Sequence, residues 1–309
     1  TDKDILFLKS IYTNFNSKES KTIKNIEKVT NHDVKSIEYY IKSIIESNPI
    51  LTDKNISTLV HFGLTSQDIN SSSYILSIKN CIRTIIIPNI NIIFNTLLNY
   101  SNLWKDIVML TRTHGQPASP SLLGKELLVY IERIDNQLIK LKNVKYKTKF
   151  GGAIGNFNSL HFSNPNINWI IFAENFIESL DLTRNKYTTQ IDHYDNYSEI
   201  FDIIKRLNNI FIDLCQDIWL YISQNYFCLK INDKEVGSST MPHKVNPINF
   251  ENAEGNFLLA NNLLQFLSDK LPKSRLQRDL TDSTILRNLG TAFSYTLIGY
   301  SSLLIGLQK

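Results

Sequence analysis

The 309-residue chain has few cysteines, glycines and prolines, and each shortage argues against a class of protein. Its three cysteines lack the spacing of a metal site and cannot all pair with one another. This argues against a disulfide scaffold and favours a reducing compartment, which we expect to be the cytoplasm. Only 11 glycines and 8 prolines argue against a loop-rich fold and favour long uninterrupted elements.

Strong net charge and unbroken hydrophobic runs are also lacking. The net charge of +4 is too weakly basic to indicate nucleic acid, although it suits a polyanionic small substrate. The apolar run around Ile85 is interrupted by Pro88 and by asparagines, so we expect no membrane span. We likewise expect no signal peptide at the start of the chain. A hydrophobic content of 42% with 20% charged residues is that of an ordinary globular protein.

Apolar residues at helical spacing predict an all-α fold without a strand-rich block. Long helices suggest a bundle over residues 65–309, preceded by part of a small helical domain over 1–64. Pro88 should kink its helix. The predicted helices cover residues 4–14, 20–27, 34–47, 68–105, 121–149, 168–180, 197–227, 248–267 and 292–309.

The stretch 237–247 reads Gly-Ser-Ser-Thr-Met-Pro-His-Lys-Val-Asn-Pro and separates two helical patterns. Asn246 followed by Pro247 predicts a helix N-cap with proline at the first helical position. Lys244 and Asn246 would then lie at the positive end of a helix, where an anion can bind. The alternative is an ordinary loop between helices with a good cap.

Three further polar loops surround His61, His114 and Arg278. Thr65 and Asp68 have the spacing of a capping box, and a helix should also begin near residues 31–33, capped by asparagine or aspartate. Because alternate helix ends meet in a bundle, these loops could build one site. They offer imidazoles, hydroxyls and cations but no metal cluster. Such a site suits proton abstraction beside a carboxylate, followed by loss of a leaving group.

The glycine-rich turn at 151–156 suggests a nucleotide site only superficially. It lacks both the preceding strand and the glycine spacing of a dinucleotide-binding fingerprint. We therefore reject a Rossmann interpretation.

The stretch 237–247 matches the signature of the fumarase/aspartase superfamily at every fixed position. Within it, the chain resembles the adenylosuccinate lyase family from about residue 31 onward, through segments 111–118, 188–190 and 278–284 and through His243. The resemblance implies a long-helix bundle of the fumarase/aspartase type. It also implies β-elimination of fumarate from adenylosuccinate to give AMP, and from the succinylated aminoimidazole carboxamide ribotide, in purine biosynthesis.

The resemblance further implies residue roles, without metal or cofactor. Ser238 would be the general base, stabilised by Lys244, and His114 the general acid, oriented by Glu251. Glu251 could instead be an ordinary first-turn glutamate. The implied substrate-binding residues are Asn31, His32, Asp33, His61, Thr65, Ser66, Thr113, Gln190, Ser239, Met241, Asn246, Asn252, Arg278, Ser283 and Arg287.

The resemblance implies a homotetramer whose sites each take loops from three subunits, with neither nucleic acid nor membrane as partner. The family's N-terminal Arg-Tyr pair and its small C-terminal domain find no counterpart, so we expect a fragment of a longer protein.

Two alternatives to this function remain. Another fumarate-releasing lyase, such as argininosuccinate lyase, is disfavoured by Arg278 and His243. A helical scaffold or nucleic-acid binder without chemistry is disfavoured by Ser238, His114 and Lys244.

Overall fold

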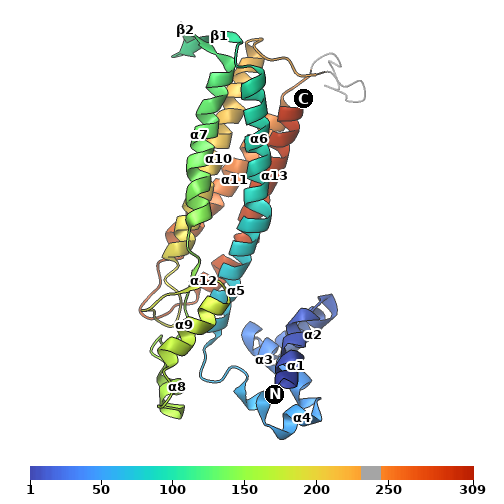
Figure 1. Cartoon of the computed structure of the whole chain (residues 1–309), viewed down its shortest axis with the longest axis vertical. Coiled ribbons are helices and arrows are strands. Elements are labelled where there is room, and N and C mark those ends of the chain that lie inside the picture. Colours follow the sequence, from blue (N-terminus) through green and yellow to red (C-terminus); the bar gives the residue numbers. More distant parts are fainter. Residues whose placement is uncertain (231–244) are drawn as a thin grey trace. The chain divides into compact units, whose positions relative to one another are not determined.

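The computed structural model describes residues 1–230 and 245–309, and 69% of the chain is helical (Figure 1). The predicted all-α class is confirmed. By compactness the chain forms two units: residues 1–76 with 146–192, and residues 77–145 with 193–309. The functional division predicted from the sequence, at residue 64, stays a prediction.

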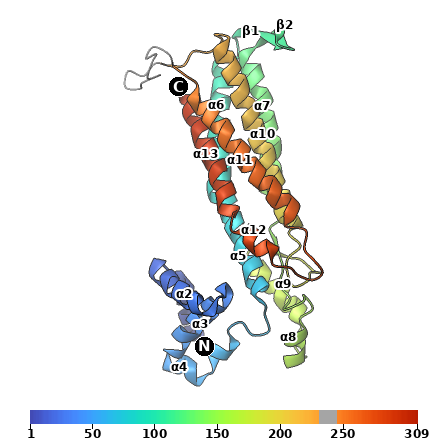
Figure 2. The same ribbon diagram turned by 180° about the vertical axis from the view of Figure 1, so that it is seen from behind.

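The second unit is a bundle of long helices that run side by side in both views (Figures 1 and 2). Its core contains the stacked rings of Phe211 and Phe257, with Tyr300 against both. Gly299 is required there, because a Cβ atom would lie 2.4 Å from the Phe257 ring. The helices are α6 (Ile87–Leu103), α7 (Leu123–Asn143), α10 (Asp195–Ser223), α11 (Ile248–Lys270) and α13 (Leu289–Gln308), with short α12 (Thr281–Leu286) before α13.

Helix α6 continues from α5 (Ser66–Cys81) through a π-helical turn, η2 (Ile82–Ile86). The Ile87 N–H bonds to the Ile82 carbonyl, five residues back, directly before Pro88. The interruption predicted at Pro88 is therefore a π turn that precedes it. By length and composition the stretch 66–103 could also cross a membrane, a test that the core helices of globular proteins can pass as well.

The prediction of a polar loop around His114 is wrong, because the residues on both sides of it form an antiparallel hairpin. Strands β1 (Val108–Thr113) and β2 (Gln116–Leu122) pair with a bulge between Leu110 and Arg112. The turn residues His114 and Gly115 both have positive φ, 55° and 73°. Two such residues match the twist of a hairpin, whereas two prolines in β2 concealed the strand in the sequence.

The first unit combines the N-terminal helices with a second segment. Helices α8 and α9 lie in this second segment, where the two-residue strands β3 and β4 pair in parallel. The elements are α1 (Asp2–Thr13), α2 (Ser17–Thr30), α3 (Asp33–Glu46), α4 (Pro49–Asp53), η1 (Ile56–Leu59), β3 (Lys147–Thr148), α8 (Asn158–Ser163), α9 (Trp169–Ser179) and β4 (Thr183–Arg184).

Two predicted helix caps are displaced by one residue. The cap of α3 is His32, whose Nδ1 accepts from the Lys35 N–H at 3.2 Å, and neither Asn31 nor Asp33. Asn31 instead ends α2 in the left-handed conformation. Helix α11 begins at Ile248 with Pro247 at the cap position, so Asn246 is not its N-cap. Proline fixes φ but leaves ψ free, and here ψ of 44° is not helical.

Candidate active site

The imidazole of His32 is held between a helix start and Ser66. Its Nδ1 accepts the Lys35 N–H, so Nε2 is the nitrogen able to carry the ring proton in the neutral form. Nε2 lies 3.4 Å from Ser66 Oγ, while Asp33 Oδ1 is 3.4 Å from Nδ1. The ring is 50% exposed. The structure therefore brings together two residues that the sequence predicted separately, on a face open to a ligand.

His61 lies beside a buried carboxylate, Glu38, that was not predicted from the sequence. Its Nδ1 is 4.0 Å from Glu38 Oε2, and its own backbone is left-handed, with φ of 64°. Burial opposes ionisation of Glu38, but hydrogen bonds from Lys42 and Lys35 outweigh it and hold the Glu38 pKa below its ordinary value. The ionised carboxylate can thus orient His61. The available sequence signal was the three- and four-residue spacing of these lysines.

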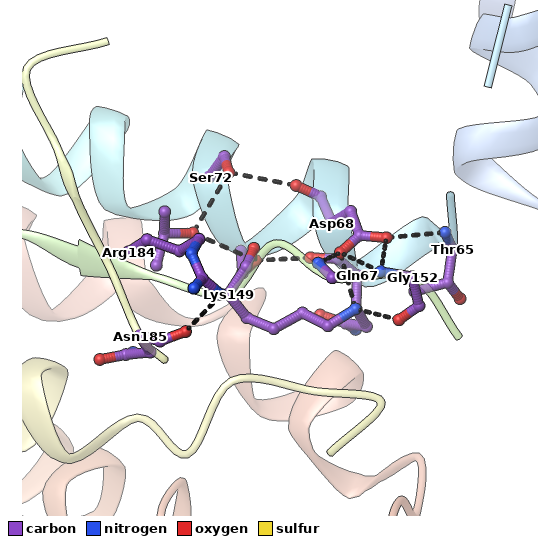
Figure 3. Close-up of polar contacts among 11 residues, drawn as sticks. Thr65, Gln67, Asp68, Ser72, Lys149, Gly152, Arg184 and Asn185 are labelled. Carbon is purple, nitrogen blue, oxygen red and sulfur yellow. Dashed lines mark hydrogen bonds and ion pairs between the residues drawn. The ribbon is translucent and has the colours of Figure 1, made fainter. Parts of the chain in front are cut away.

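Asp68 lies in the first turn of α5 and accepts the Thr65 N–H at 2.9 Å. This is one half of the predicted capping box. The same carboxylate accepts hydrogen bonds from Lys149 Nζ at 2.7 Å and from the Gly151 and Gly152 N–H groups (Figure 3). Ser71 and Ser72, one turn further along α5, bond to the Lys149 carbonyl and to the Thr148 hydroxyl. We call all these residues the Asp68 cluster: Asp68, Ser71, Ser72, Thr148, Lys149, Gly151 and Gly152.

Gln190 is half-buried in the segment that follows β4. Two contacts of Asn185 hold this segment at its start. The Asn185 N–H donates to the Thr148 carbonyl at 2.8 Å, and its side-chain amide donates to Asp192 Oδ1 at 2.8 Å. Gln190 therefore lies on a loop fixed on both sides, in the same compact unit as His32, Ser66 and Thr65.

Thr113 and His114 lie at the tip of the β1–β2 hairpin. Arg112 Nη1 donates to the Gly115 carbonyl at 3.1 Å, which braces the turn. The His114 side chain is exposed and has no hydrogen-bond partner within the described residues. The hairpin thus presents an imidazole on a defined backbone, available to a ligand or to another chain.

Glu251 and Asn252 lie in the first turn of α11. Glu251 accepts a hydrogen bond from Trp219 Nε1 at 3.0 Å, and Asn252 donates to Ser302 Oγ at 2.7 Å. Within the described part of this single chain, Glu251 makes no hydrogen bond to His114. In this single chain the Glu251 carboxylate is instead oriented by the Trp219 indole.

Arg278, Ser283 and Arg287 lie around α12. The carboxylate of Asp279 orders this segment, and hydrogen bonds from the Thr281 hydroxyl and N–H hold its pKa well below its usual range. Arg278 and Arg287 form no ion pair among the described residues. Two uncompensated cations suit a phosphate or carboxylate ligand.

Four of the predicted site residues belong to the stretch between helices α10 and α11. Ser238, Ser239, Met241 and Lys244 lie in the segment 231–244, outside the described residues. Within the described ranges, no group of three or more histidine, cysteine, aspartate or glutamate side chains could hold a metal ion.

Comparisons with known proteins identify the family of the chain. Residues 1–258 match the family described as Lyase, and residues 274–309 match Adenylosuccinate lyase C-terminal. A protein named adenylosuccinate lyase from Dictyostelium discoideum is 50% identical over 306 residues, covering 98% of this chain and 66% of the relative. One of the same name from Legionella pneumophila (strain Corby) is 48% identical over 303 residues, with 98% and 66% covered. The chain thus spans about 66% of the length of these relatives.

Solved structures share the fold at low identity. A fumarate lyase from Mesorhizobium sp. BNC1 has a TM-score of 0.77 at 16% identity, covering 98% of this chain and 65% of that one. A 3-carboxy-cis,cis-muconate lactonizing enzyme from Pseudomonas putida has a TM-score of 0.74 at 20% identity, with 95% and 63% covered. These two show the fold alone. By its family matches and its curated relatives, the chain belongs to the adenylosuccinate lyase family of the fumarase/aspartase superfamily.

Proposed function

We propose that the protein is a C–N lyase that releases fumarate from adenylosuccinate to give AMP. The observation that carries this proposal is the 50% identity to a protein named adenylosuccinate lyase over 98% of the chain. Cleavage of the succinylated aminoimidazole carboxamide ribotide is proposed as a second reaction, since it breaks the same type of C–N bond. The free state of all three cysteines supports a cytoplasmic location.

The proposed elimination needs one base and one acid. Ser238 removes a proton from the carbon beside the succinyl carboxylate, and the electron pair of that C–H bond becomes the double bond of fumarate. The C–N bond breaks, and His114 donates a proton to the departing nitrogen. Lys244 would stabilise the alkoxide form of Ser238. The exposed position of His114 on a braced hairpin turn supports its role as the acid.

The remaining residues would bind the substrate. Arg278 and Arg287, which have no carboxylate partner among the described residues, are proposed to contact the phosphate together with Ser283. The hydroxyls of Thr65 and Ser66 at the start of α5, with His32 beside them, are suited to a succinyl carboxylate. The proposed set also includes Asn31, Asp33, His61, Thr113, Gln190, Ser239, Met241, Asn246 and Asn252.

A homotetramer with sites shared between three subunits is proposed for the assembly. Glu251 makes no hydrogen bond to His114 within the described part of one chain, and in the proposed tetramer another copy supplies one of the two groups. The bundle also exposes large apolar side chains on α11, including Leu258, Leu259 and Phe266. Such a surface is typical of an interface. Light scattering that gives a monomer at micromolar concentration would contradict the proposed tetramer.

Fumarate release from adenylosuccinate by the full-length protein tests the proposed reaction. We expect Ser238→Ala to lower kcat by about 10²–10⁴-fold, the usual contribution of a general base. Ser223→Ala is the matched control, because its exposed hydroxyl only bonds back to the Leu220 carbonyl of its own helix. Release that survives in Ser238→Ala would move the base elsewhere. No release by the folded parent would favour the scaffold alternative.

A further inference from the structure

Lys149 and Asp68 form an ion pair that is completely withdrawn from water. Both side chains are 0% exposed, and Lys149 Nζ lies 2.7 Å from Asp68 Oδ1. Lys149 Nζ also donates to the Gly152 carbonyl at 2.6 Å. A buried ion pair is seldom more stabilising than apolar side chains of the same size. Its position in the fold therefore calls for an explanation other than net stability.

On one side, the pair fixes the start of α5. The second carboxylate oxygen of Asp68 accepts the Thr65 N–H at 2.9 Å, immediately before Ser66. One turn later, Ser71 Oγ donates to the Lys149 carbonyl at 3.1 Å, and Ser72 Oγ lies 3.2 Å from Thr148 Oγ1. The segment 147–152 is thus attached to the first two turns of α5 by directional contacts (Figure 3).

On the other side, the same segment supports the loop that carries Gln190. Strand β3 pairs with β4, and the Asn185 N–H donates to the Thr148 carbonyl at 2.8 Å. Gly155 lies so close to the next part of this loop that a Cβ atom there would be 2.3 Å from the Thr188 carbonyl oxygen. Residues 147–155 therefore contact both the helix start at Thr65 and the loop at 188–190.

Only a carboxylate satisfies all the donors around Asp68. Oδ1 accepts from Lys149 Nζ and the Gly151 N–H, while Oδ2 accepts from the Thr65 and Gly152 N–H groups. An asparagine has one acceptor oxygen, so its NH2 group would face two of these donors. Oδ1 thus holds residues 149 and 151, while Oδ2 joins the start of α5 to residue 152.

We propose that Asp68 and Lys149 are positioning residues that set the spacing between the Thr65–Ser66 helix start and the 188–190 loop. The inference rests on the proposed function, in which these two segments bind the substrate. The pair itself is buried beneath them and touches no ligand. Its loss should weaken substrate binding more than it slows the chemical step, since the proposed base and acid are on other segments.

The test compares Lys149→Met and the double variant Asp68→Asn/Lys149→Met with the full-length parent. The double variant removes both charges, so it avoids an unpaired charge in the interior. We expect KM for adenylosuccinate to rise about tenfold or more in both, with kcat changed much less. Thr296→Val is the matched control. It removes a buried hydroxyl that bonds to Asn208 in the bundle, so stability should fall while KM stays at the parental value.

Each outcome decides the proposal. A folded double variant with the parental KM overturns it, and so does an equal rise of KM in Thr296→Val. If Lys149→Met does not fold, the double variant replaces it. If neither folds, the pair is structural only and the proposal is wrong.

A parent that releases no fumarate would overturn the proposed reaction instead. Positioning is then measured by amide hydrogen exchange over residues 185–192. We expect exchange to be faster in the double variant than in the parent and in Thr296→Val. Unchanged exchange would overturn the inference independently of the reaction.

Discussion

The bundle core and the Asp68 cluster both exclude water, but with opposite kinds of side chain. Where α10, α11 and α13 meet, the rings of Phe211, Phe257 and Tyr300 pack with centroids 5.4–5.8 Å apart. In the Asp68 cluster every buried side chain is polar or charged, and each is tied to a particular donor or acceptor.

The bundle core and the Asp68 cluster should differ in how well they tolerate substitutions. Apolar packing is non-directional, so a core can lose or exchange some volume and still exclude water. A buried polar network is directional, and removal of one partner leaves another without a hydrogen bond. We therefore expect the bundle to accept conservative changes and the Asp68 cluster to reject them. Substitutions in the two regions test this expectation.

Asp68→Ala should have the largest effect on stability. It leaves the buried ammonium of Lys149 without its carboxylate and removes the acceptor of three backbone N–H groups. Breaking a buried ion pair from one side costs about 3–5 kcal/mol. Urea unfolding should show this loss in the free energy of unfolding. A loss below that of Phe257→Leu would contradict the comparison.

Tyr194→Phe should have the next largest effect, because it removes one directional contact from the bundle unit. The Tyr194 hydroxyl donates to Asp282 Oδ2 at 2.9 Å, and both residues are buried. Loss of a donor to a buried polar group costs about 1–3 kcal/mol. Thermal unfolding measures the change, with Tyr187→Phe as control because Tyr187 is 91% exposed. Equal stability of Tyr194→Phe and Tyr187→Phe would show that the Tyr194–Asp282 hydrogen bond contributes little to the stability of this unit.

Phe257→Leu should cost less, at about 1–1.5 kcal/mol, because the core keeps an apolar side chain of similar volume. The same unfolding measurement applies. Leu276→Ala is the control, since Leu276 is 89% exposed and should be nearly neutral. A loss near that of Asp68→Ala would mean that the bundle is as intolerant as the Asp68 cluster.

The smallest expected effects are two pH dependences of opposite sign. The lowered pKa of Glu38 means that its stabilising contribution is full above its ordinary value of 4.5 and is lost as the pH falls. Burial raises the pKa of Asp217 although the Tyr130 hydroxyl opposes this. The contribution of Asp217 to the free energy of unfolding is therefore full below pH 3.8, its ordinary pKa, and is lost as the pH rises through the raised pKa.

The free energy of unfolding of Glu38→Gln and of Asp217→Asn, measured across pH 3–8, separates these two pH dependences. The cost of Glu38→Gln should be greatest near neutral pH and shrink as the pH falls. Asp217→Asn should become more favourable, relative to the parent, as the pH rises. Parallel pH profiles for the two variants would show that one of the two assignments is wrong.

The sequence predicted the long helices well because their apolar periodicity is strong. Residues 197–227 were predicted and α10 spans Asp195–Ser223, while 168–180 corresponds to α9 at Trp169–Ser179. The hairpin was not predicted because β2 contains two prolines and both strands alternate weakly. The caps of α3 and α11 each differ by one residue from the prediction, because the His32 imidazole caps α3 and the non-helical ψ of Pro247 starts α11 one residue later.

The candidate site was only partly predictable. The spacing of Thr65 and Asp68 indicated one hydrogen bond of a capping box, and the structure contains it. Nothing local indicates that Lys149 is buried, because its carboxylate partner is 81 residues away in the chain. A lysine in a sequence is usually exposed, and only tertiary contact reveals this exception. The catalytic roles of Ser238 and His114 stay predictions.

The π turn before Pro88 resolves a mismatch of rotational phase. Ile78, Ile82, Ile86 and Ile90 are all at most 3% exposed and follow one another at intervals of four. Four residues of α-helix overshoot a full turn by about 40°, so three such steps would carry Ile90 about 120° from Ile78. The wider turn at 82–86 rotates less per residue than an α-helix and so offsets part of this drift, which helps to keep all four isoleucines buried. Deletion of a single residue there would rotate everything beyond it by about 100°, so the length of this short turn, more than its composition, sets the face that α6 buries.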